Sequence, residues 1–424
     1  MKIAILSHYF WPEMGAPSAR LLELGRAWVA EGHEVSVVTN FPNHPTGIIP
    51  EGYRGRRFQI EPVEGLRVIR CRTYATPNRG FLKRTLGHLF FMAQAVVQAT
   101  PPLHGIDVLV ASSPTLFSVV AAWVISRRLG VPFVFEVRDL WPAIFVDLGV
   151  IRSRFVIRGL EGLELFLYRR SAAVVTVTEA FARNIRERGI DAAKTHVLPN
   201  GVDLDFFTPG PPDPGLRASL GPTATFVVLY CGALGISHAL DRILDVAGLL
   251  RGDPRIHFLF VGEGAEKDAL QARASSLGLG NVSFRPGVSR DHVPALYRSA
   301  DVCLVPLRNV PLFRSFVPSK MFEILACARP IVASVAGEAA AILTASGAAI
   351  VVPPEDAEAL SRAILRLADD PGLGAQMGAR GRPYVATHFD RRALARRYLD
   401  ILGQVVGGGA GRGSVPGEGR KGDS

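Results

Sequence analysis

The chain has 424 residues, of which 48% are hydrophobic and 20% charged, and its formal net charge is +10. That length exceeds one ordinary hydrophobic core, so we expect two domains. The four cysteines are scattered without a CxxC spacing, which argues against a zinc ribbon or disulfide framework and favours a reducing cytoplasm. The first residues lack the apolar region and cleavage site of a secretory signal peptide, so we expect none.

The positive charge is concentrated in the first half of the chain. Residues 1–200 hold 24 Lys and Arg against 16 Asp and Glu, whereas residues 201–424 hold 24 against 22. Such a bias suits an anionic membrane surface or a polyanionic substrate. No helix-turn-helix, zinc-finger or aromatic RNA-binding pattern accompanies it, so nucleic acid is not an expected partner.

Short β-type runs alternate with helical stretches along the whole sequence. In the first half these runs are Lys2–Leu6, Glu34–Thr39, Leu66–Arg70, Asp107–Ala111, Pro132–Val137, Ala173–Val177 and His196–Leu198. In the second half they are Thr225–Tyr230, Ile256–Val261, Val282–Phe284, Val302–Pro306, Ile331–Val335 and Ala349–Val352. Helical periodicity lies between them, for example over Ala19–Glu31, Ala239–Leu250 and Ala357–Leu367. This alternation predicts an α/β protein of two doubly wound domains with parallel sheets.

Composition also predicts the domain boundaries. The Pro- and Gly-rich residues 208–222 predict a linker between a first domain, 1–207, and a second, 223–388. Residues 389–406 predict an Arg-rich helix that returns to the first domain, and the Gly-rich residues 407–424 predict a disordered tail. Ligands of such sheets bind at the carboxyl ends of the strands, so a cleft between two facing domains is the expected site.

Two motifs follow predicted strands of the first domain. SHYFWPEMGAPSAR, residues 7–20, contains Gly15, which can bring the backbone close to a ligand at a helix start; a plain βα turn is the alternative. FVFEVRDLWP, residues 133–142, ends a buried strand with Arg138 and Asp139. Asp139 is placed to touch a substrate hydroxyl or to accept a proton, and the alternative is an Arg–Asp pair that holds the loop.

Glycine-bearing loops follow predicted strands of the second domain. Gly232 and Gly235 in LYCGALGIS give a backbone loop that can cradle a phosphate at a helix entry. Gly262 in VGEGAEKDAL repeats this arrangement, although a tight turn explains it more simply. The FRPGV segment, which contains Pro286, can line a base pocket with main-chain groups.

The segment FVPSKMFEILACARPIVAS predicts a helix that begins after Pro318-Ser319, with Ser319 as a possible cap. Lys320 is unusual there, because a cation in the first turn faces the positive end of the helix dipole. We interpret it as the partner of a bound anion. Glu323 lies on the same helical face, so an ammonium for a diphosphate would accompany a carboxylate for ribose hydroxyls. The AGE turn, residues 336–338, offers backbone amides at another strand end.

Together these motifs resemble the retaining family 4 glycosyltransferases of GT-B fold. The resemblance covers roughly residues 1–405 and rests on PEMGAPSAR, GHEVSVVTNFP, LPNGVD, YCGALG, FVGEG, ADVCLVPL, PSKMFEILACARPIV and the AGE turn. The DLWP and PSK-x-x-E variants are similar to the WbuB-like transferases of O-antigen, capsule and colanic-acid assembly. The resemblance implies two Rossmann-like domains that face across a cleft. It also implies transfer of a sugar such as N-acetyl-L-fucosamine from UDP to an undecaprenyl-diphosphate-linked acceptor.

The resemblance implies residue roles only where the motifs match. Glu323 matches the second Glu of the family's E-x7-E motif, expected on the donor's ribose, whereas Ser315 occupies the first Glu position. The residues ISH, 236–238, stand where the family has an Arg/Lys pair beside the departing diphosphate, so Lys320 is expected to supply that charge. The expected donor-binding residues are Gly232, Gly235, Gly262, Pro286, Lys320, Glu323, Gly337 and Glu338.

The implied reaction retains the anomeric configuration and needs no metal or other cofactor. Its expected catalytic residues are Lys320 and Asp139, and its expected acceptor-side residues are Gly15 and Arg138. The DxD pattern at residues 203–205 binds a metal in another glycosyl-transfer architecture. Here it follows an Asn-Gly turn signal rather than a buried strand, so we interpret it as a domain junction.

A membrane contact is also expected. Residues 78–102 combine a basic start with an apolar body whose uncharged part, Thr85–Thr100, is short for a spanning helix. We interpret it as an interfacial helix near a lipid-linked acceptor, with a buried core helix as the alternative. With the basic stretch Ile151–Arg170, it predicts a cytoplasmic protein that is peripheral on the inner face of the plasma membrane.

Three other functions stay open. A UDP-sugar 2-epimerase shares the GT-B fold but needs no acceptor. A non-catalytic partner subunit is a second alternative, because Ser315 and Ser237 depart from the family pattern. A nicotinamide-dependent oxidoreductase is the third, but no strand is followed by GxGxxG with an acidic residue about 20 positions later.

Overall fold

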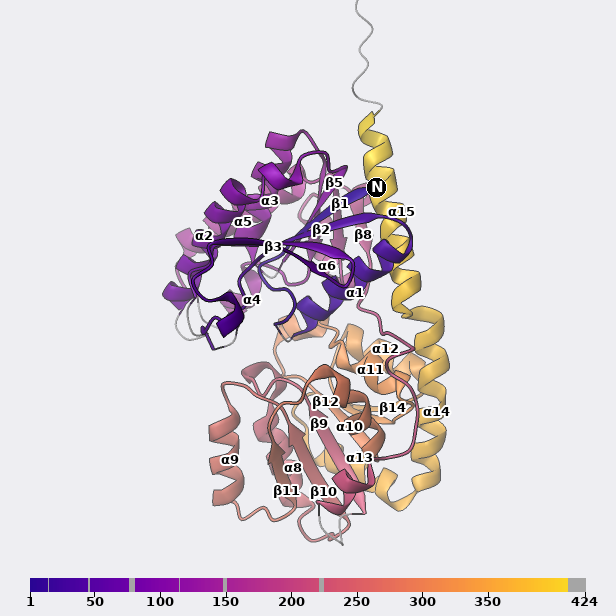
Figure 1. Ribbon diagram of the computed structural model, residues 1–424. Coiled ribbons are helices and arrows are strands. Elements are labelled where there is room, and N and C mark those ends of the chain that lie inside the picture. The colour runs from indigo at the N-terminus through magenta and orange to yellow at the C-terminus, as the bar shows by residue number, and fades with distance from the viewer. Residues whose placement is uncertain are drawn as a thin grey trace, which may run out of the picture. The chain divides into compact units, whose positions relative to one another are not determined.

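The chain forms two compact units (Figure 1). The computed structural model describes residues 1–13, 15–44, 46–75, 81–113, 115–147, 151–220 and 225–410. Unit 1 comprises Met1–Leu198 together with the segment that begins at Arg392, and unit 2 comprises Pro199–Arg391. The chain therefore leaves the first unit once and returns to it near its end.

Unit 1 is built on an eight-stranded sheet with the order β3-β4-β2-β1-β5-β6-β7-β8. The strands are β1 Lys2–Leu6, β2 Glu34–Asn40, β3 Phe58–Val63, β4 Leu66–Cys71, β5 Val108–Ser112, β6 Phe133–Val137, β7 Ala173–Thr176 and β8 Thr195–Val197. Neighbours pair in parallel except β3, which is antiparallel to β4. The sequence did not predict β3, because this edge strand is half exposed and contains Pro62.

Helices cover both faces of this sheet. They are α1 Ala16–Ala30, α2 Phe81–Gln98, α3 Leu116–Leu129, α4 Ala143–Asp147, α5 Arg154–Arg170, α6 Glu179–Glu187 and α15 Arg391–Ala410. On one face, Trp28 of α1 packs in a single core with Tyr398 and Leu402 of α15. The Trp28 indole N–H also donates to the carbonyl of Ala395 at 3.1 Å. The last helix is thus an integral part of the first core.

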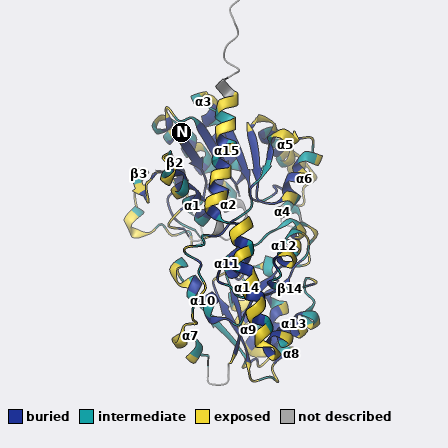
Figure 2. Cartoon of the chain, turned by 90° about the vertical axis from the view of Figure 1, so that its right-hand side faces the viewer, coloured by how far each residue is buried: buried dark blue, intermediate teal, exposed yellow. Residues whose placement is uncertain are grey.

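Unit 2 contains a six-stranded, wholly parallel sheet with the order β11-β10-β9-β12-β13-β14. Its strands are β9 Phe226–Cys231, β10 Ile256–Val261, β11 Val282–Arg285, β12 Val302–Pro306, β13 Ile331–Ser334 and β14 Ala349–Val352. Its helices are α7 Pro214–Ala218, α8 Leu240–Leu249, α9 Lys267–Ser276, α10 Val293–Ser299, α11 Lys320–Ala326, α12 Glu338–Ser346, α13 Ala357–Asp369 and α14 Pro371–His388. Figure 2 shows buried strands and helices with exposed outer faces in both units.

The predicted α/β architecture of two doubly wound sheets is confirmed. Residues 208–220 of the predicted linker, however, contain α7 and lie within unit 2. Arg217 of α7 pairs with Asp301 through two hydrogen bonds of 2.7 Å, which fixes this segment to the sheet. At the other end, α15 continues to Ala410, four residues into the predicted tail, and residues 411–424 lie outside the described range.

The helix predicted to lie at a membrane surface is α2. Its inner face is buried through His88, Phe91 and Ala95, while Leu86 and Val97 are 57% and 67% exposed. The helix therefore contributes to the core of unit 1 and still presents apolar side chains outward. None of the described helices combines the length and apolar character needed to cross a membrane.

Candidate functional site

Lys320, the first residue of α11, lies against the aromatic ring of Tyr230 on β9. Its Nζ atom is 4.0 Å from the ring centroid. That atom is buried and, within the described residues, has no hydrogen-bond partner. Burial lowers the pKa of Lys320 to about 8, although the nearby Cys231 and Glu323 partly oppose this effect. An ammonium with three unused donors is well suited to a multiply charged oxyanion.

The local structure around α11 differs in part from the prediction. Met321, Ile324 and Leu325 form the buried face of this helix. Ser319, in contrast, has helical dihedral angles and its side chain makes no cap hydrogen bond, so the predicted Ser cap is wrong. The helix ends at Ala326 and contains only seven residues.

Glu323 lies one turn after Lys320 and is buried. The Tyr297 hydroxyl donates to its Oε2 at 3.2 Å. Burial raises the pKa of Glu323, while the positive charge of Arg290 and the Tyr297 hydrogen bond act in the opposite direction. No ion pair within 4.0 Å joins Glu323 to Lys320 among the described residues. The carboxylate is therefore available to polar ligand groups.

Two loops, which contain Gly232 and Gly262, pack against each other beside Lys320. A Cβ atom on Gly232 would lie 2.6 Å from Lys320 Nζ, so glycine leaves the space that the ammonium occupies. A Cβ on Gly262 would lie 1.9 Å from the Gly232 carbonyl oxygen, so the two loops pack backbone to backbone. The Gly232 amide donates to the backbone carbonyl of Val261 at 2.9 Å, and the Gly262 amide donates to the backbone carbonyl of Arg285 at 3.2 Å. The Gly232 amide is therefore already used as a donor, so a phosphate in this loop would have to be bound by other groups; the phosphate-binding role of the loop stays a prediction.

The other predicted donor-binding residues lie along the same carboxyl edge of the unit 2 sheet. Gly235 precedes the 3-10 turn Ile236–His238, and Pro286 is exposed directly after β11. Gly337 has a φ of +71°, and a Cβ there would lie 1.9 Å from the Arg314 carbonyl oxygen. Close backbone packing therefore explains Gly337. Glu338 is half-buried and opens α12.

His238 is a further site residue, and no role was predicted for it. Its ring lies 5.8 Å from the Tyr230 ring, and its Nδ1 is 3.4 Å from the Pro306 carbonyl oxygen. Burial, together with the charge of Lys320, lowers the pKa of His238 to about 3. The imidazole is therefore neutral at physiological pH, which leaves Lys320 as the cation of this cluster.

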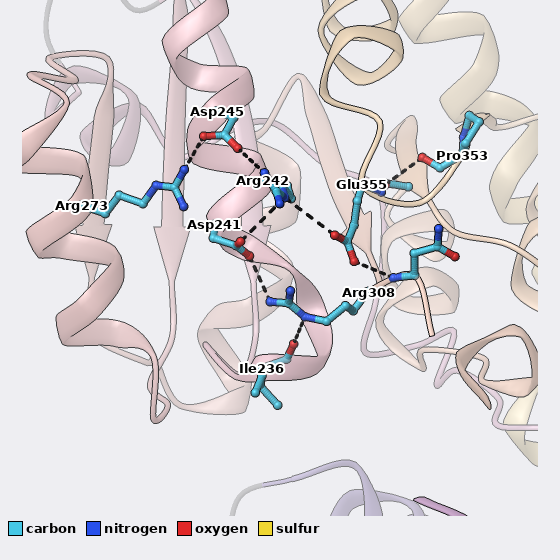
Figure 3. Close-up of polar contacts among 10 residues, drawn as sticks. Ile236, Asp241, Arg242, Asp245, Arg273, Arg308, Pro353 and Glu355 are labelled. Carbon is cyan, nitrogen blue, oxygen red and sulfur yellow. Dashed lines mark hydrogen bonds and ion pairs between the residues drawn. The ribbon is translucent and has the colours of Figure 1, made fainter. Parts of the chain in front are cut away.

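A network of charged side chains holds the loop after β9 (Figure 3). Arg308 donates from Nε to the Ile236 carbonyl at 2.8 Å and from its second terminal nitrogen to Asp241 at 3.1 Å. Glu355 lies 3.7 Å from Arg242 and accepts from the Asn309 amide at 2.7 Å. The network thus joins the carboxyl ends of β9, β12 and β14. None of these charged residues was predicted.

In unit 1, the carboxyl end of β6 carries a buried ion pair. Arg20 of α1 donates from Nε to Glu136 at 3.0 Å and from a terminal nitrogen to the Leu198 carbonyl at 3.2 Å. The Ser112 hydroxyl donates to the other Glu136 oxygen at 2.7 Å. Burial alone would raise the pKa of Glu136, but these partners and Arg138 outweigh it and lower that pKa.

Arg138 and Asp139 follow directly. Arg138 is 9% exposed, and one terminal nitrogen of its guanidinium is buried without a hydrogen-bond partner among the described residues. Burial lowers the pKa of Arg138 to about 10 and raises the pKa of Asp139. No ion pair within 4.0 Å joins the two in the described ranges, so the alternative of an Arg–Asp pair is not supported. Gly15 lies immediately before α1, the helix whose Arg20 pairs with Glu136.

A histidine cluster lies after β1 and was also missed. The His8 ring is 4.6 Å from the His88 ring of α2, and its Nε2 lies 3.2 Å from the Asn40 amide nitrogen. Burial, and then the nearby His88 and His44, hold the pKa of His8 well below its usual value. The His8 imidazole is therefore neutral near pH 7 and packs edge-on against the His88 ring.

The DxD residues are part of a turn. Asp203 Oδ1 accepts hydrogen bonds from the amides of Asp205 and Phe206, at 3.0 and 3.1 Å. Across the described residues, no group of three or more His, Cys, Asp or Glu side chains is arranged to hold a metal ion.

Comparisons with known proteins identify both units. A model of the glycosyl transferase 4-like domain matches residues 15–201, and a model of glycosyl transferases group 1 matches residues 225–370. The colanic acid biosynthesis glycosyl transferase WcaI of Escherichia coli (strain K12) is 27% identical to this chain. The match covers 95% of this chain and 100% of WcaI. The chain is a glycosyltransferase of the GT-B fold.

Solved structures support the same fold for this glycosyltransferase. Sucrose-phosphate synthase from Thermosynechococcus elongatus superposes with a TM-score of 0.74 at 21% identity, over 96% of this chain and 99% of that one. Anabaena HepE in complex with UDP-glucose gives 0.71 at 18% identity, over 95% and 100%. Lys320 and Glu323 lie within the group 1 match, and Arg138 and Asp139 within the 4-like match.

Proposed function

We propose that this glycosyltransferase transfers a sugar from a UDP-sugar, with retained configuration, to a lipid-diphosphate-linked saccharide in the synthesis of bacterial surface polysaccharide. The observation that carries the proposal is the buried Lys320 ammonium, which lies on the Tyr230 ring with no hydrogen-bond partner among the described residues. The full-length similarity to WcaI supports a polysaccharide product. The resemblance of the DLWP and PSK-x-x-E motifs supports a donor such as UDP-N-acetyl-L-fucosamine and an undecaprenyl diphosphate acceptor.

The chemistry requires a fixed positive charge on the donor side. When the sugar–diphosphate bond breaks, negative charge grows on the leaving oxygen, and a preorganised cation in a buried site stabilises it strongly. Lys320 occupies such a position, and the buried Glu323 carboxylate can accept hydrogen bonds from ribose hydroxyls. The proposal assigns no step to a metal ion.

On the acceptor side, the proposal gives Asp139 the role of orienting or assisting the acceptor hydroxyl. Burial raises the pKa of this carboxyl group, a shift that suits general acid–base catalysis near neutral pH. The leaving diphosphate itself can take the acceptor proton. Asn or Ala at position 139 should therefore lower turnover while UDP binding stays unchanged.

The proposal also includes a peripheral membrane contact through unit 1. Phe155 and Val156 at the start of α5 are 86% and 49% exposed, and Arg152, Arg154 and Arg158 are exposed around them. Exposed apolar residues among arginines are typical of an interfacial helix on anionic lipid. Flotation with anionic and neutral vesicles tests this contact, using Phe155→Ser as the variant. Unchanged flotation of that variant would remove α5 from the proposal.

The central experiment is a two-stage assay on the full chain. Calorimetry with UDP, GDP and ADP should show binding of UDP, and Lys320→Met should remove most of that affinity. UDP release from UDP-sugars should then depend on a polyprenyl-diphosphate saccharide. The transferred sugar should have the same anomeric configuration in the product as in the donor. Release of a free epimerised sugar without acceptor would instead identify an epimerase. Failure to bind any nucleotide would contradict the proposal.

A further inference from the structure

Arg138 is a buried cation without a contacting counter-ion. It follows β6, and the whole residue is 9% exposed. One terminal nitrogen of its guanidinium is fully buried and has no hydrogen-bond partner among the described residues. A buried polar group of this kind is costly unless a partner completes it, and an unpaired charge costs more. The side chain is therefore arranged for a partner that the chain itself does not supply.

The carboxylates near Arg138 do not serve as that partner. Glu136 is committed on both oxygens, to Arg20 at 3.0 Å and to Ser112 at 2.7 Å. Asp139 has no ion pair within 4.0 Å in the described ranges, and burial raises its pKa. The charges that act on Arg138 are those of Glu136, Arg20 and Asp139. Glu136 and Asp139 favour the charged form of Arg138 and Arg20 opposes it, but none of the described carboxylates lies within 4.0 Å of the guanidinium.

The backbone of Arg138 is held in place, while one terminal nitrogen of its guanidinium lacks a hydrogen-bond partner among the described residues. Its amide donates to the Ser113 hydroxyl at 2.8 Å, which joins the ends of β5 and β6. This end is the carboxyl edge of a parallel sheet, where ligands of doubly wound units bind. A fixed backbone, together with a buried guanidinium nitrogen that lacks a partner among the described residues, is the arrangement of a preorganised anion receptor rather than of a surface arginine.

We propose that Arg138 binds an oxyanion of the acceptor, namely a phosphate of its diphosphate group. The inference rests on the proposed function, because that function supplies a diphosphate on the acceptor lipid. A planar guanidinium with several parallel N–H donors matches the oxygens of a phosphate in a two-pronged contact. Arg138 thereby positions the acceptor through its phosphate. Asp139, the next residue, then contacts the acceptor hydroxyl. Selection of diphosphate-linked over phosphate-free acceptors depends on this residue.

The first test measures binding of inorganic pyrophosphate to the full chain by calorimetry, with saturating UDP present to occupy the Lys320 site. Wild-type protein should bind pyrophosphate, and Arg138→Gln should weaken that binding by about 10- to 100-fold, the range for a hydrogen bond to a charged group. Arg138→Lys should recover part of the loss. Arg183→Gln, which removes an exposed arginine of the same unit, is the matched control and should bind normally. Absence of pyrophosphate binding to the wild-type protein would overturn the inference without reference to any variant.

The second test compares two acceptors that carry the same saccharide, one on a short polyprenyl diphosphate and one on a phosphate-free alkyl glycoside. Arg138→Gln should raise KM for the first by about tenfold or more and leave KM for the second unchanged. An equal change for both acceptors would show a structural role and overturn the inference. UDP affinity should stay constant in Arg138→Gln, and a drop would assign Arg138 to the donor's phosphates. If the wild-type protein does not bind UDP, the proposed function itself is contradicted.

Discussion

The Lys320 ammonium lies 4.0 Å from the centre of the Tyr230 ring and has no other polar contact in the described part of the chain. The ring partly compensates the buried charge, since a cation–π contact contributes about 0.5 to 2 kcal/mol. It does so without occupying the N–H donors. Tyr230 thus allows a lysine to stay charged and still be free for a ligand.

Removal of this cation should have a large kinetic effect. We expect Lys320→Met to lower turnover with UDP-sugar by roughly 100-fold, the size typical for loss of a preorganised electrostatic donor. Steady-state rates of UDP release measure the effect. Arg362→Met, which removes an exposed arginine of unit 2, is the control and should match the wild-type rate. A Lys320→Met rate within about threefold of wild type would show that the diphosphate charge is met elsewhere.

The lowered pKa of Lys320 predicts a pH dependence of UDP affinity. In the free enzyme this pKa is about 8, and only the protonated ammonium attracts a diphosphate. Affinity should therefore be highest below pH 8 and fall as pH rises through 8, by at most about tenfold per pH unit for one proton. Bound diphosphate raises the pKa, so the decline ends at a higher pH. Calorimetry of Lys320→Arg should show no such decline between about pH 7 and 9.5, because a guanidinium stays charged.

Arg308 should position the loop after β9 rather than contact the donor. Its two hydrogen bonds, to Ile236 and Asp241, hold the loop after β9 (Figure 3). Gly232 of this loop lies directly beside the Lys320 ammonium. We expect Arg308→Ala to raise donor KM by about fivefold to tenfold, because one charge-assisted hydrogen bond contributes about 1.5 kcal/mol or more. Acceptor KM should stay constant, and a double-mutant cycle with Asp241→Asn should show coupling. Equal changes in donor and acceptor KM would indicate general destabilisation instead.

The Arg20–Glu136 pair should contribute to stability in a pH-dependent manner. Glu136→Gln leaves the buried Arg20 guanidinium without its counter-ion and should cost about 3 to 5 kcal/mol in the free energy of unfolding at pH 7. The pKa of Glu136 is lowered in the folded state, so its contribution is present above the usual carboxyl pKa and is lost as pH falls through the lowered value. Urea unfolding at neutral and acidic pH measures the difference. Glu34→Gln, at the exposed pair with Lys2, should change stability by less than about 1 kcal/mol.

The last helix should be required for the stability of unit 1. Leu402 of α15 is fully buried in the core that contains Trp28, so Leu402→Ala should cost about 2 to 5 kcal/mol. Thermal unfolding measures this loss. Arg397→Ala, at an exposed position on the same helix, is the control, and the difference between the two melting temperatures gives the contribution of the buried side chain. Equal melting temperatures would show that α15 is not part of the cooperative core.

The sequence predicted the strands well because buried parallel strands appear as continuous apolar runs. Lys2–Leu6, Ile256–Val261 and Val302–Pro306 agree with the structure to the residue. The half-exposed β3 has no such run and was missed. Lys320 was identified by a local contradiction, a cation at the start of a helix, which needs no knowledge of distant contacts.

Contacts between distant residues could not be predicted in this way. Arg308 and Ile236 are separated by 72 positions, and Arg20 and Glu136 by 116, and no periodicity connects them. Gly232 shows another limit of the sequence. A glycine after a strand suggested a phosphate-binding loop, but its own amide donates to the carbonyl of Val261, the last residue of β10. Only the paired backbone shows that the glycine is needed for close packing and for the lysine beside it.

The return of α15 to the first core has a consequence for biosynthesis. On the ribosome, the eight strands of unit 1 emerge first, but the helix that covers the Trp28 side is translated after all of unit 2. The contiguous second unit can complete its core during translation, whereas the first keeps an apolar face uncovered until α15 has been made. The nascent protein is thus expected to need chaperone protection through most of its translation, and a chain released before α15 would be a substrate for proteolysis.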